Sequence, residues 1–368
     1  MKGTSKDRIR AGLIGVGNWA RYGHIPALQS LPQYEITAVS SREMVKAQEL
    51  AKSFGIRHAF TDPTQLIEHP EVDLVVVLPP APEHAPLSRR AIEAGKDVYC
   101  EWPLTTKTAD SQNLLALAKA AGVRHIVGLQ RRMGPSARYL RDLLAQGYIG
   151  DLRSIRMHVS IEYFGPVRPP SLEWTLPAAN FSHLLSIYGG HFFDLLFYVA
   201  GRPQTVSAIV AKQFPTLTLS RTGESFPNET PDEVLVQGRL SNDALYSVQI
   251  EAGKLNNAGL QIDLTGTEGD LKISNTKSFG NVTDNLIEGA RGSGRKLEIM
   301  PVPAEYELPV SSSLDASVQD LVHLYAAFAA DRTSGASRAP GFNDAVQMHR
   351  FIDAVTKASD AGATQLTD

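Results

Sequence analysis

Three small residues near the amino terminus have the spacing of a phosphate-binding turn. Gly15, Gly17 and Ala20 give G-x-G-x-x-A, with Asn18 and Trp19 inside it, directly after the apolar run IRAGLIGV and before a helix-like segment. The first glycine suits a tight turn, the second admits a pyrophosphate to the backbone, and Ala20 permits close helix packing. A helix N-terminus adds unpaired N–H groups. The pattern predicts a dinucleotide site; the alternative is a glycine turn without a ligand.

The end of the second apolar run bears on which dinucleotide binds. An NAD-selective site usually carries Asp or Glu there, but this run ends in Ser40, Ser41 and Arg42. Hydroxyls and a guanidinium suit the 2'-phosphate of NADP, so NADP is favoured over NAD. Ser40 with Glu43 also fits a helix capping box, and Arg42 could simply be solvated.

The first part of the chain predicts an α/β Rossmann domain with a doubly wound parallel sheet. From Ile9 to about Gln146, short apolar runs alternate with helical periods, which is typical of strand-helix crossovers. The expected strands are IRAGLIGV, YEITAVS, VDLVVVL, DVYC and HIVGL, and the expected helices include IPALQSL, EMVKAQELAKSF, APLSRRAIEAG and DSQNLLALAKAAG.

After Gly150 the pattern changes to alternating runs that predict an α+β domain with a large, mainly antiparallel open sheet. The runs are LRSIRMHVSIEYF, VSAIVAKQF, EVLVQGRL, LYSVQIEAG, GLQIDLTG and DLKISN, with helices at GGHFFDLLFYVAG and FNDAVQMHRFIDAVTKAS. A long loop is expected over 276–313. We therefore predict a cofactor domain over 1–130 and a substrate and oligomerisation domain over 131–368.

Composition excludes several classes of function. A chain of 368 residues with a formal net charge of −3 and a pI near 6.4 has no excess of basic residues for nucleic acid. No apolar run reaches the roughly 20 residues that span a bilayer, and the first residues lack a secretory apolar region, so a cytoplasmic location is expected. Cys100 is the only cysteine, which excludes an internal disulfide and a multi-cysteine zinc site; no metal is expected.

Four stretches that follow one another along the chain resemble the Gfo/Idh/MocA oxidoreductase family. They are GLIGVGNWA, VDLVVVLPPAPEHAPLSRRAIEAGKDVYCEWPL, HIVGLQRRMGPSARYLRDLLAQGYIGDLRSI and GGHFFDLLFYVAG. CEWPL, PDEVLVQGRL and IDLTGTEGDLKIS are similar to the branch that includes the yeast galactose-regulon repressor. The resemblance implies a substrate pocket between a Rossmann and an α+β domain, and a homodimer or homotetramer.

The resemblance also shows what this chain lacks. The family's acid/base lysine in Glu-Lys-Pro is replaced by Trp102, whose indole only donates a hydrogen bond, and its second helper, an aspartate, is replaced by Ile187. His191 matches the family histidine and is the best remaining general base, with Tyr188 one turn before it and Asp194 one turn after. A satisfied, half-buried histidine is the alternative.

The remaining assignments follow from the resemblance. Glu101 and Trp102 match positions beside the nicotinamide, Pro79 and His84 match the loop that passes the cofactor, and Gln130 matches a position facing the pocket. Segments that approach the substrate in the family contribute Tyr163, Arg168, Trp174 and His183. Each also has a plain structural interpretation: His84 could cap a helix, and aromatic residues in such strands are more often core.

These observations favour an oxidoreductase that uses NADP or NAD to transfer a hydride to or from a sugar, polyol or related keto compound. Trp102 and Ile187 support a second hypothesis, a non-catalytic NAD(P)-binding regulator that acts through a protein partner. A reductase of imines or activated alkenes is a third, which the sequence does not separate from the first.

Overall fold

The chain divides into two compact units by its internal contacts. A computed structural model describes residues 8–278, 285–308 and 314–367. The first unit comprises Met1–Met133 with Pro309–Gln347, and the second Gly134–Leu308 with Met348–Asp368. The break at Met133 lies close to the predicted boundary at 130. The prediction of two continuous domains did not include the later segment, Pro309–Gln347, that belongs to the first unit.

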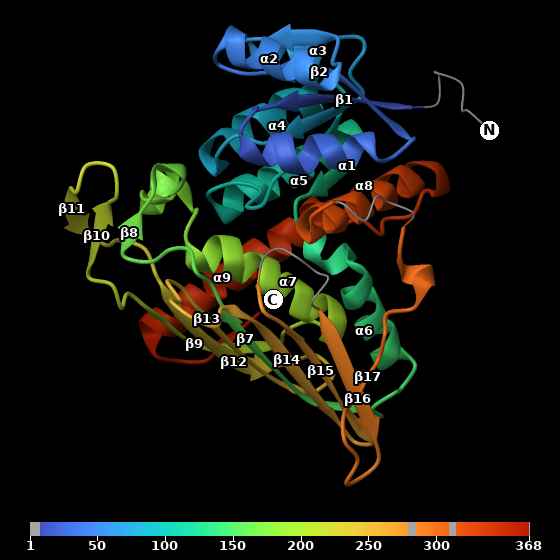
Figure 1. Ribbon diagram of the computed structural model, residues 1–368, viewed down its shortest axis with the longest axis vertical. Helices are drawn as coiled ribbons and strands as arrows, with labels where there is room; N and C mark the ends of the chain where they lie inside the picture. The colour runs from blue at the N-terminus through green and yellow to red at the C-terminus, as the bar shows by residue number, and fades with distance from the viewer. Residues whose placement is uncertain (1–7, 279–284, 309–313, 368) are drawn as a thin grey trace. The chain divides into compact units, whose positions relative to one another are not determined.

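The first unit contains the predicted doubly wound parallel sheet, which is confirmed. Its strand order is β3-β2-β1-β4-β5-β6, and every pair is parallel. The first two strands, β1 and β2, are labelled and drawn in blue in Figure 1. The strands are β1 (Ile9–Ile14), β2 (Tyr34–Ser40), β3 (His58–Phe60), β4 (Leu74–Val77), β5 (Asp97–Cys100) and β6 (His125–Val127). The order reverses between β1 and β4, and in such sheets ligands bind outside the carboxyl ends of the strands at that point.

Helices follow the strands of this sheet as the sequence periodicity predicts. They are α1 (Ile25–Gln29), α2 (Met44–Phe54), α3 (Pro63–Glu68), α4 (His84–Glu93) and α5 (Thr108–Ala121). Gly55 and Gly122 end α2 and α5 with positive φ, which a glycine C-cap adopts without strain. The short strand β3 and the short helix α3 were absent from the sequence-based expectation.

A long helix, α8 (Ala316–Ser334), joins the first unit although it lies far along the chain. It packs against α1 and the turn before it. Tyr325 of α8 is fully buried, and its carbonyl accepts a 2.7 Å hydrogen bond from the Tyr34 hydroxyl of β2. The sequence analysis did not predict α8, and placed its residues in the second domain.

The second unit contains a nine-stranded sheet of order β17-β16-β15-β14-β7-β13-β12-β9-β18. The strands are β7 (Leu152–Ser160), β9 (Thr205–Ala211), β12 (Glu233–Arg239), β13 (Leu245–Glu251), β14 (Gly259–Gly266), β15 (Gly269–Asn275), β16 (Leu286–Arg291), β17 (Glu298–Ile299) and β18 (Gln365–Leu366). Only β7 and β13 pair in parallel, so the predicted mainly antiparallel sheet is confirmed. The long loop expected over 276–313 is wrong where described, because β16 and β17 extend the sheet there.

Helices α6 (Pro135–Ala145), α7 (Gly190–Ala200) and α9 (Phe342–Ala361) and a small sheet complete the second unit, which holds α9 from Met348 onward. Phe351 of α9 packs edge-on against Phe193 and Phe197 of α7. The small sheet has the order β11-β10-β8, formed by β8 (Val167–Arg168), β10 (Thr216–Leu219) and β11 (Ser225–Pro227). No helix in the described ranges is both long and apolar enough to cross a membrane.

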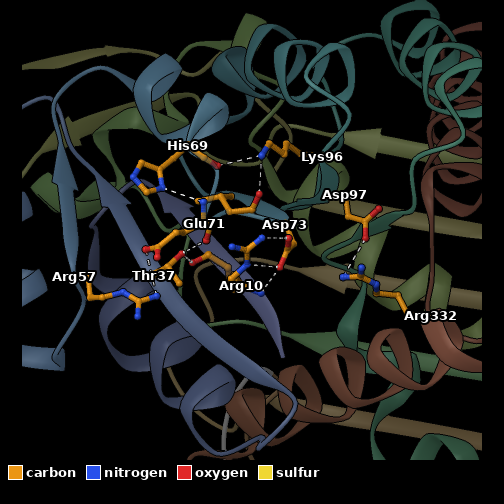
Figure 2. A network of polar contacts seen from close by, with 11 residues as sticks. Arg10, Thr37, Arg57, His69, Glu71, Asp73, Lys96, Asp97 and Arg332 are labelled. Atoms are coloured by element: carbon orange, nitrogen blue, oxygen red, sulfur yellow. Dashed lines mark hydrogen bonds and ion pairs between the residues drawn. The ribbon is translucent and has the colours of Figure 1, made fainter. Parts of the chain in front are cut away.

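An ionic network joins the amino-terminal ends of the strands in the first unit (Figure 2). Arg10 of β1 donates from Nε and Nη2 to the Asp73 carboxylate at 2.9 and 2.7 Å, and its backbone N–H donates to the same group at 3.0 Å. Burial raises the pKa of Asp73, but the Arg10 hydrogen bonds offset this and hold that pKa below its usual range. The pair therefore fixes the start of β1 beside the start of β4.

The outer part of this network surrounds Glu71. His58 Nε2 lies 2.8 Å from its carboxylate, and Arg57 Nη2 lies 3.4 Å away. The side-chain ligand atoms of His58, His69 and Glu71 lie within 4.8 Å of one another. Because the Arg57 guanidinium shares the same carboxylate, we interpret this cluster as ion pairing at the sheet edge.

We expect Asp73→Asn to lower the free energy of unfolding by about 1–3 kcal/mol at neutral pH, since it weakens hydrogen bonds to a charged group. A depressed folded-state pKa contributes stability above the unfolded value near 3.9 and loses it as pH falls through the folded value. The difference in free energy of unfolding between Asp73→Asn and wild type should thus become smaller below about pH 4. Urea unfolding across pH measures this, with the exposed Asp360→Asn as control; equal effects of both substitutions would contradict it.

Candidate functional site

A cleft of about 540 Å³ lies at the carboxyl ends of β1, β2 and β4, all in the first unit. Gly15 ends β1 with φ +100°, and its N–H donates to the Ser40 carbonyl of β2 at 2.9 Å. A side chain at Gly15 would be strained by that φ and would contact Leu78 and Pro79. The turn predicted at the first glycine is therefore the floor of the cleft.

Gly17 leaves room for a ligand next to this turn. A Cβ built at Gly17 meets no protein atom within 4 Å. Packing against the protein therefore does not require a glycine at this position. Helical residues begin at Asn18, Ala20 is buried, and Trp19 is half-buried. The open space at Gly17, beside the start of the helix, would let a pyrophosphate come close to the backbone N–H groups.

The second-strand residues predicted to select the cofactor line the same cleft. Ser40, Ser41 and Arg42 all contribute to its wall. The alternative capping box is wrong: α2 has Glu43 as its N-cap with no side-chain cap, and the Glu43 N–H approaches Ser41 Oγ at 3.4 Å. Arg42 is exposed and makes no ion pair with any residue that the structure describes. Its guanidinium is available to an anion.

Glu101, predicted to lie beside the nicotinamide, is held by three donors. Its Oε1 accepts hydrogen bonds from Trp19 Nε1 at 3.1 Å and from the Tyr99 hydroxyl at 2.7 Å. His24 Nε2 lies 2.7 Å from the same oxygen, and its Nδ1 lies 2.8 Å from the Tyr325 hydroxyl of α8. Burial raises the pKa of the Tyr99 hydroxyl far above its usual range, so it remains a donor. Sequence reasoning did not anticipate His24, Tyr99 or Tyr325.

His84 supports the cleft wall and does not itself line it. The ring is buried, with Nε2 2.6 Å from the Pro79 carbonyl and Nδ1 2.7 Å from the Pro103 carbonyl. Burial lowers the pKa of His84, although both carbonyls favour the protonated ring. The residue thus joins the loop after β4, which does line the cleft through Pro79, to the loop after β5.

Trp102 and Gln130 are buried in the first unit, outside the cleft lining. The side-chain oxygen of Gln130 has no hydrogen-bond partner among the residues described, which is unusual for a buried amide. Burial raises the pKa of the Cys100 thiol far above its usual value. A thiolate there is therefore strongly disfavoured, so Cys100 is not a candidate nucleophile.

The predicted acid/base residues lie in the second unit. His191 is the second residue of α7, which follows a single wide turn, Leu185–Gly189, that contains Tyr188. His191, Tyr188 and Asp194 are all buried, and Ile187 occupies the position of the missing family aspartate. The structure places the histidine and the tyrosine on consecutive turns, as expected from their spacing.

The four predicted substrate residues differ sharply in environment. Tyr163 and Trp174 are exposed, and Trp174 Nε1 donates to the Ser171 carbonyl at 2.9 Å. Burial lowers the pKa of His183 to about 4, so its ring is neutral at physiological pH. Arg168 is buried. These residues stay predictions as substrate contacts.

Comparisons with known proteins match both halves of the chain. Residues 9–129 match the family model described as "Oxidoreductase family, NAD-binding Rossmann fold", and residues 135–275 match the model "Gal80p, C-terminal domain". A dehydrogenase, aclE, of Aspergillus oryzae is 26% identical over 96% of this chain and 97% of its own length. The galactose/lactose metabolism regulatory protein GAL80 of Saccharomyces cerevisiae is also 26% identical, over 86% of this chain and 78% of its own.

A solved structure of levoglucosan dehydrogenase in complex with NADH and L-sorbose has the same fold. The TM-score is 0.87 over 98% of this chain and 99% of that chain, at 22% sequence identity. At this identity the likeness concerns the fold alone.

We expect Gly17→Val to lower NAD(P)H affinity at least about tenfold with little change in thermal stability, because the added atoms enter open space that the pyrophosphate needs. Gly12→Ala is the matched contrast: its Cβ would lie 2.8 Å from Leu66, so it should lose stability. Tryptophan fluorescence titration and thermal unfolding measure both. Unchanged affinity in Gly17→Val would contradict the site.

Proposed function

The chain belongs to the oxidoreductase family with an NAD-binding Rossmann fold, Gfo/Idh/MocA, and from this premise we propose that it transfers a hydride between NADP and a sugar, polyol or related keto compound. The observation that carries the proposal is the cleft formed by Gly15, Gly17, Ser41 and Arg42 at the point where the strand order reverses. A nicotinamide cofactor supplies or accepts the hydride when bound.

Residues of the first unit fit this cofactor. The Gly15 turn and the start of the following helix would hold the pyrophosphate, and Ser41 with Arg42 would hold a 2'-phosphate. Glu101 has a fixed position because three donors share its Oε1. It supplies an ordered carboxylate at the position that the resemblance places beside the nicotinamide.

The proton of the reacting hydroxyl needs a second group, because Trp102 replaces the family lysine. We assign this role to His191, with Tyr188 one turn away as its helper. In oxidation His191 would take the hydroxyl proton while the carbon gives up its hydride; in reduction the same imidazole would return it.

We expect the purified protein to change nicotinamide absorbance with NADP and a member of a panel of sugars, polyols and sugar lactones. His191→Asn should lower kcat at least about a hundredfold while NADPH affinity is retained, since general acid-base catalysis contributes about that much. His158→Asn, an exposed histidine of β7, is the control. Turnover that is unaffected by His191→Asn would refute the assigned base.

We further expect Arg42→Ala to weaken NADPH binding roughly fivefold to tenfold and to leave NADH binding within about twofold, because only NADPH carries the 2'-phosphate. Lys46→Ala is the matched control: Lys46 lines the same cleft but pairs with Glu43 at 2.6 Å. Fluorescence titrations with both cofactors measure the ratio. Equal loss for NADH and NADPH would overturn the proposed preference for NADP.

A second candidate function is a nucleotide-binding regulator. Trp102 and Ile187 remove both acid/base helpers of the family, and the second half of the chain matches the Gal80p C-terminal domain model. Tight NADPH binding without turnover on any substrate of the panel would favour this alternative.

A further inference from the structure

Arg168 of β8 carries a buried positive charge without a matching acceptor. Its side chain is 2% exposed. Nε and Nη1 have no hydrogen-bond partner in the part of the chain that the structure describes. A buried guanidinium normally forms an ion pair or several hydrogen bonds, because removal from water is costly. Arg168 therefore lacks acceptors for its Nε and Nη1 hydrogens, and the described residues do not supply them.

Asp232, the carboxylate whose charge acts on Arg168, is already hydrogen-bonded to other groups. Asp232 accepts hydrogen bonds from the backbone N–H groups of Gln213 and Phe214 at 2.6 and 2.9 Å, and from Asn228 Nδ2 at 3.1 Å. Burial lowers the pKa of Arg168 to about 10, although Asp232 opposes the shift. The guanidinium is thus charged at neutral pH, and Asp232 already accepts hydrogen bonds from other donors.

The surrounding loop holds this arginine against Phe164, whose ring contacts Tyr188, the proposed helper of the base. Phe164 has φ +59°, which is strained for a bulky residue, and its ring contacts the Arg168 guanidinium at 5.0 Å. The same ring packs edge-on against Tyr188 at 5.6 Å. The Gly253 N–H donates to the Tyr163 carbonyl at 2.8 Å and fixes the loop. Arg168, Phe164 and Tyr188 therefore form one packed row.

We infer that Arg168 binds an anionic group of the small-molecule ligand, a carboxylate or a phosphate. This deepens the proposed function, on which it rests for the identity of the pocket, and it narrows the substrate class to sugar acids or sugar phosphates. An anion supplies both the missing acceptors and the counter-charge. Tyr163 and Val167, which precede Arg168 in the same segment, are exposed.

The first test uses the ligand-free protein. Replacing an uncompensated buried cation by an apolar side chain of similar length should stabilise the fold, so we expect Arg168→Met to raise Tm by roughly 2–4 °C. Arg141→Met is the matched control, because Arg141 lies 4.6 Å from the Tyr198 ring in the same unit but is exposed and paired with Asp142. A lower Tm in Arg168→Met would identify a structural role and overturn the inference.

The second test measures binding without turnover. Thermal shifts are recorded with D-glucose, D-glucuronate, D-glucose 6-phosphate, inorganic phosphate and sodium chloride at equal ionic strength. An anionic probe should raise the Tm of wild type and of Arg141→Met, and at least half of that shift should disappear in Arg168→Met. If inorganic phosphate alone gives the full shift, the ligand is a free phosphate; if only a sugar anion does, it is the substrate. Equal shifts in wild type and Arg168→Met overturn the inference.

These results also separate the inference from the proposed function. Anion binding that depends on Arg168, in a protein that never transfers a hydride, would refute the oxidoreductase and leave the anion site. Turnover of neutral sugars at a rate that Arg168→Met does not change would support the oxidoreductase and refute the anion site. Arg168→Lys, which keeps the charge but not the planar group, should retain part of the anion shift.

Discussion

One carboxylate oxygen, Glu101 Oε1, joins the parts of the first unit that form the cofactor cleft. It accepts from Trp19 in the helix after the glycine turn and from Tyr99 of β5, and it contacts His24, which reaches Tyr325 of α8. Glu101 is partly buried, and a carboxylate oxygen shared by several donors in such a place couples their positions to one another. The phosphate-binding helix is therefore held from its buried side, while its other side remains available to the cofactor.

Trp102, which stands at the position of the family lysine, follows Glu101 directly and is buried. Glu101 Oε1 contacts Trp19, His24 and Tyr99, which come from other positions of the first unit. The residues proposed for cofactor binding and those proposed for acid/base chemistry are different, and they belong to the first and the second unit respectively. Substitution of an acid/base residue can therefore leave the cofactor cleft unchanged. This is consistent with similar proteins that are named as a dehydrogenase and as a regulatory protein.

The sequence predicts features that depend on local pattern. Gly15 and Gly17 were identifiable because their spacing follows a strand, and the long strands because their apolar residues alternate or run together. The sequence could not predict β3, which has three residues, or the role of Tyr325, which meets His24 across 301 positions. Nor does the sequence around Arg168 indicate burial, because β8 has two residues and its neighbours are exposed. Such features depend on contacts between distant segments, which no local period encodes.

The return of α8 to the first unit has a consequence for how the protein is made. A ribosome completes β1 to β6 and then every strand of the large sheet except β18 before Tyr325 emerges. Until that moment His24 has no Tyr325 hydroxyl to contact, and Tyr34 has no Tyr325 carbonyl to bond. The first unit is therefore synthesised first but cannot be complete until α8 has been made. During synthesis its six strands exist without the helix that contacts His24 and Tyr34.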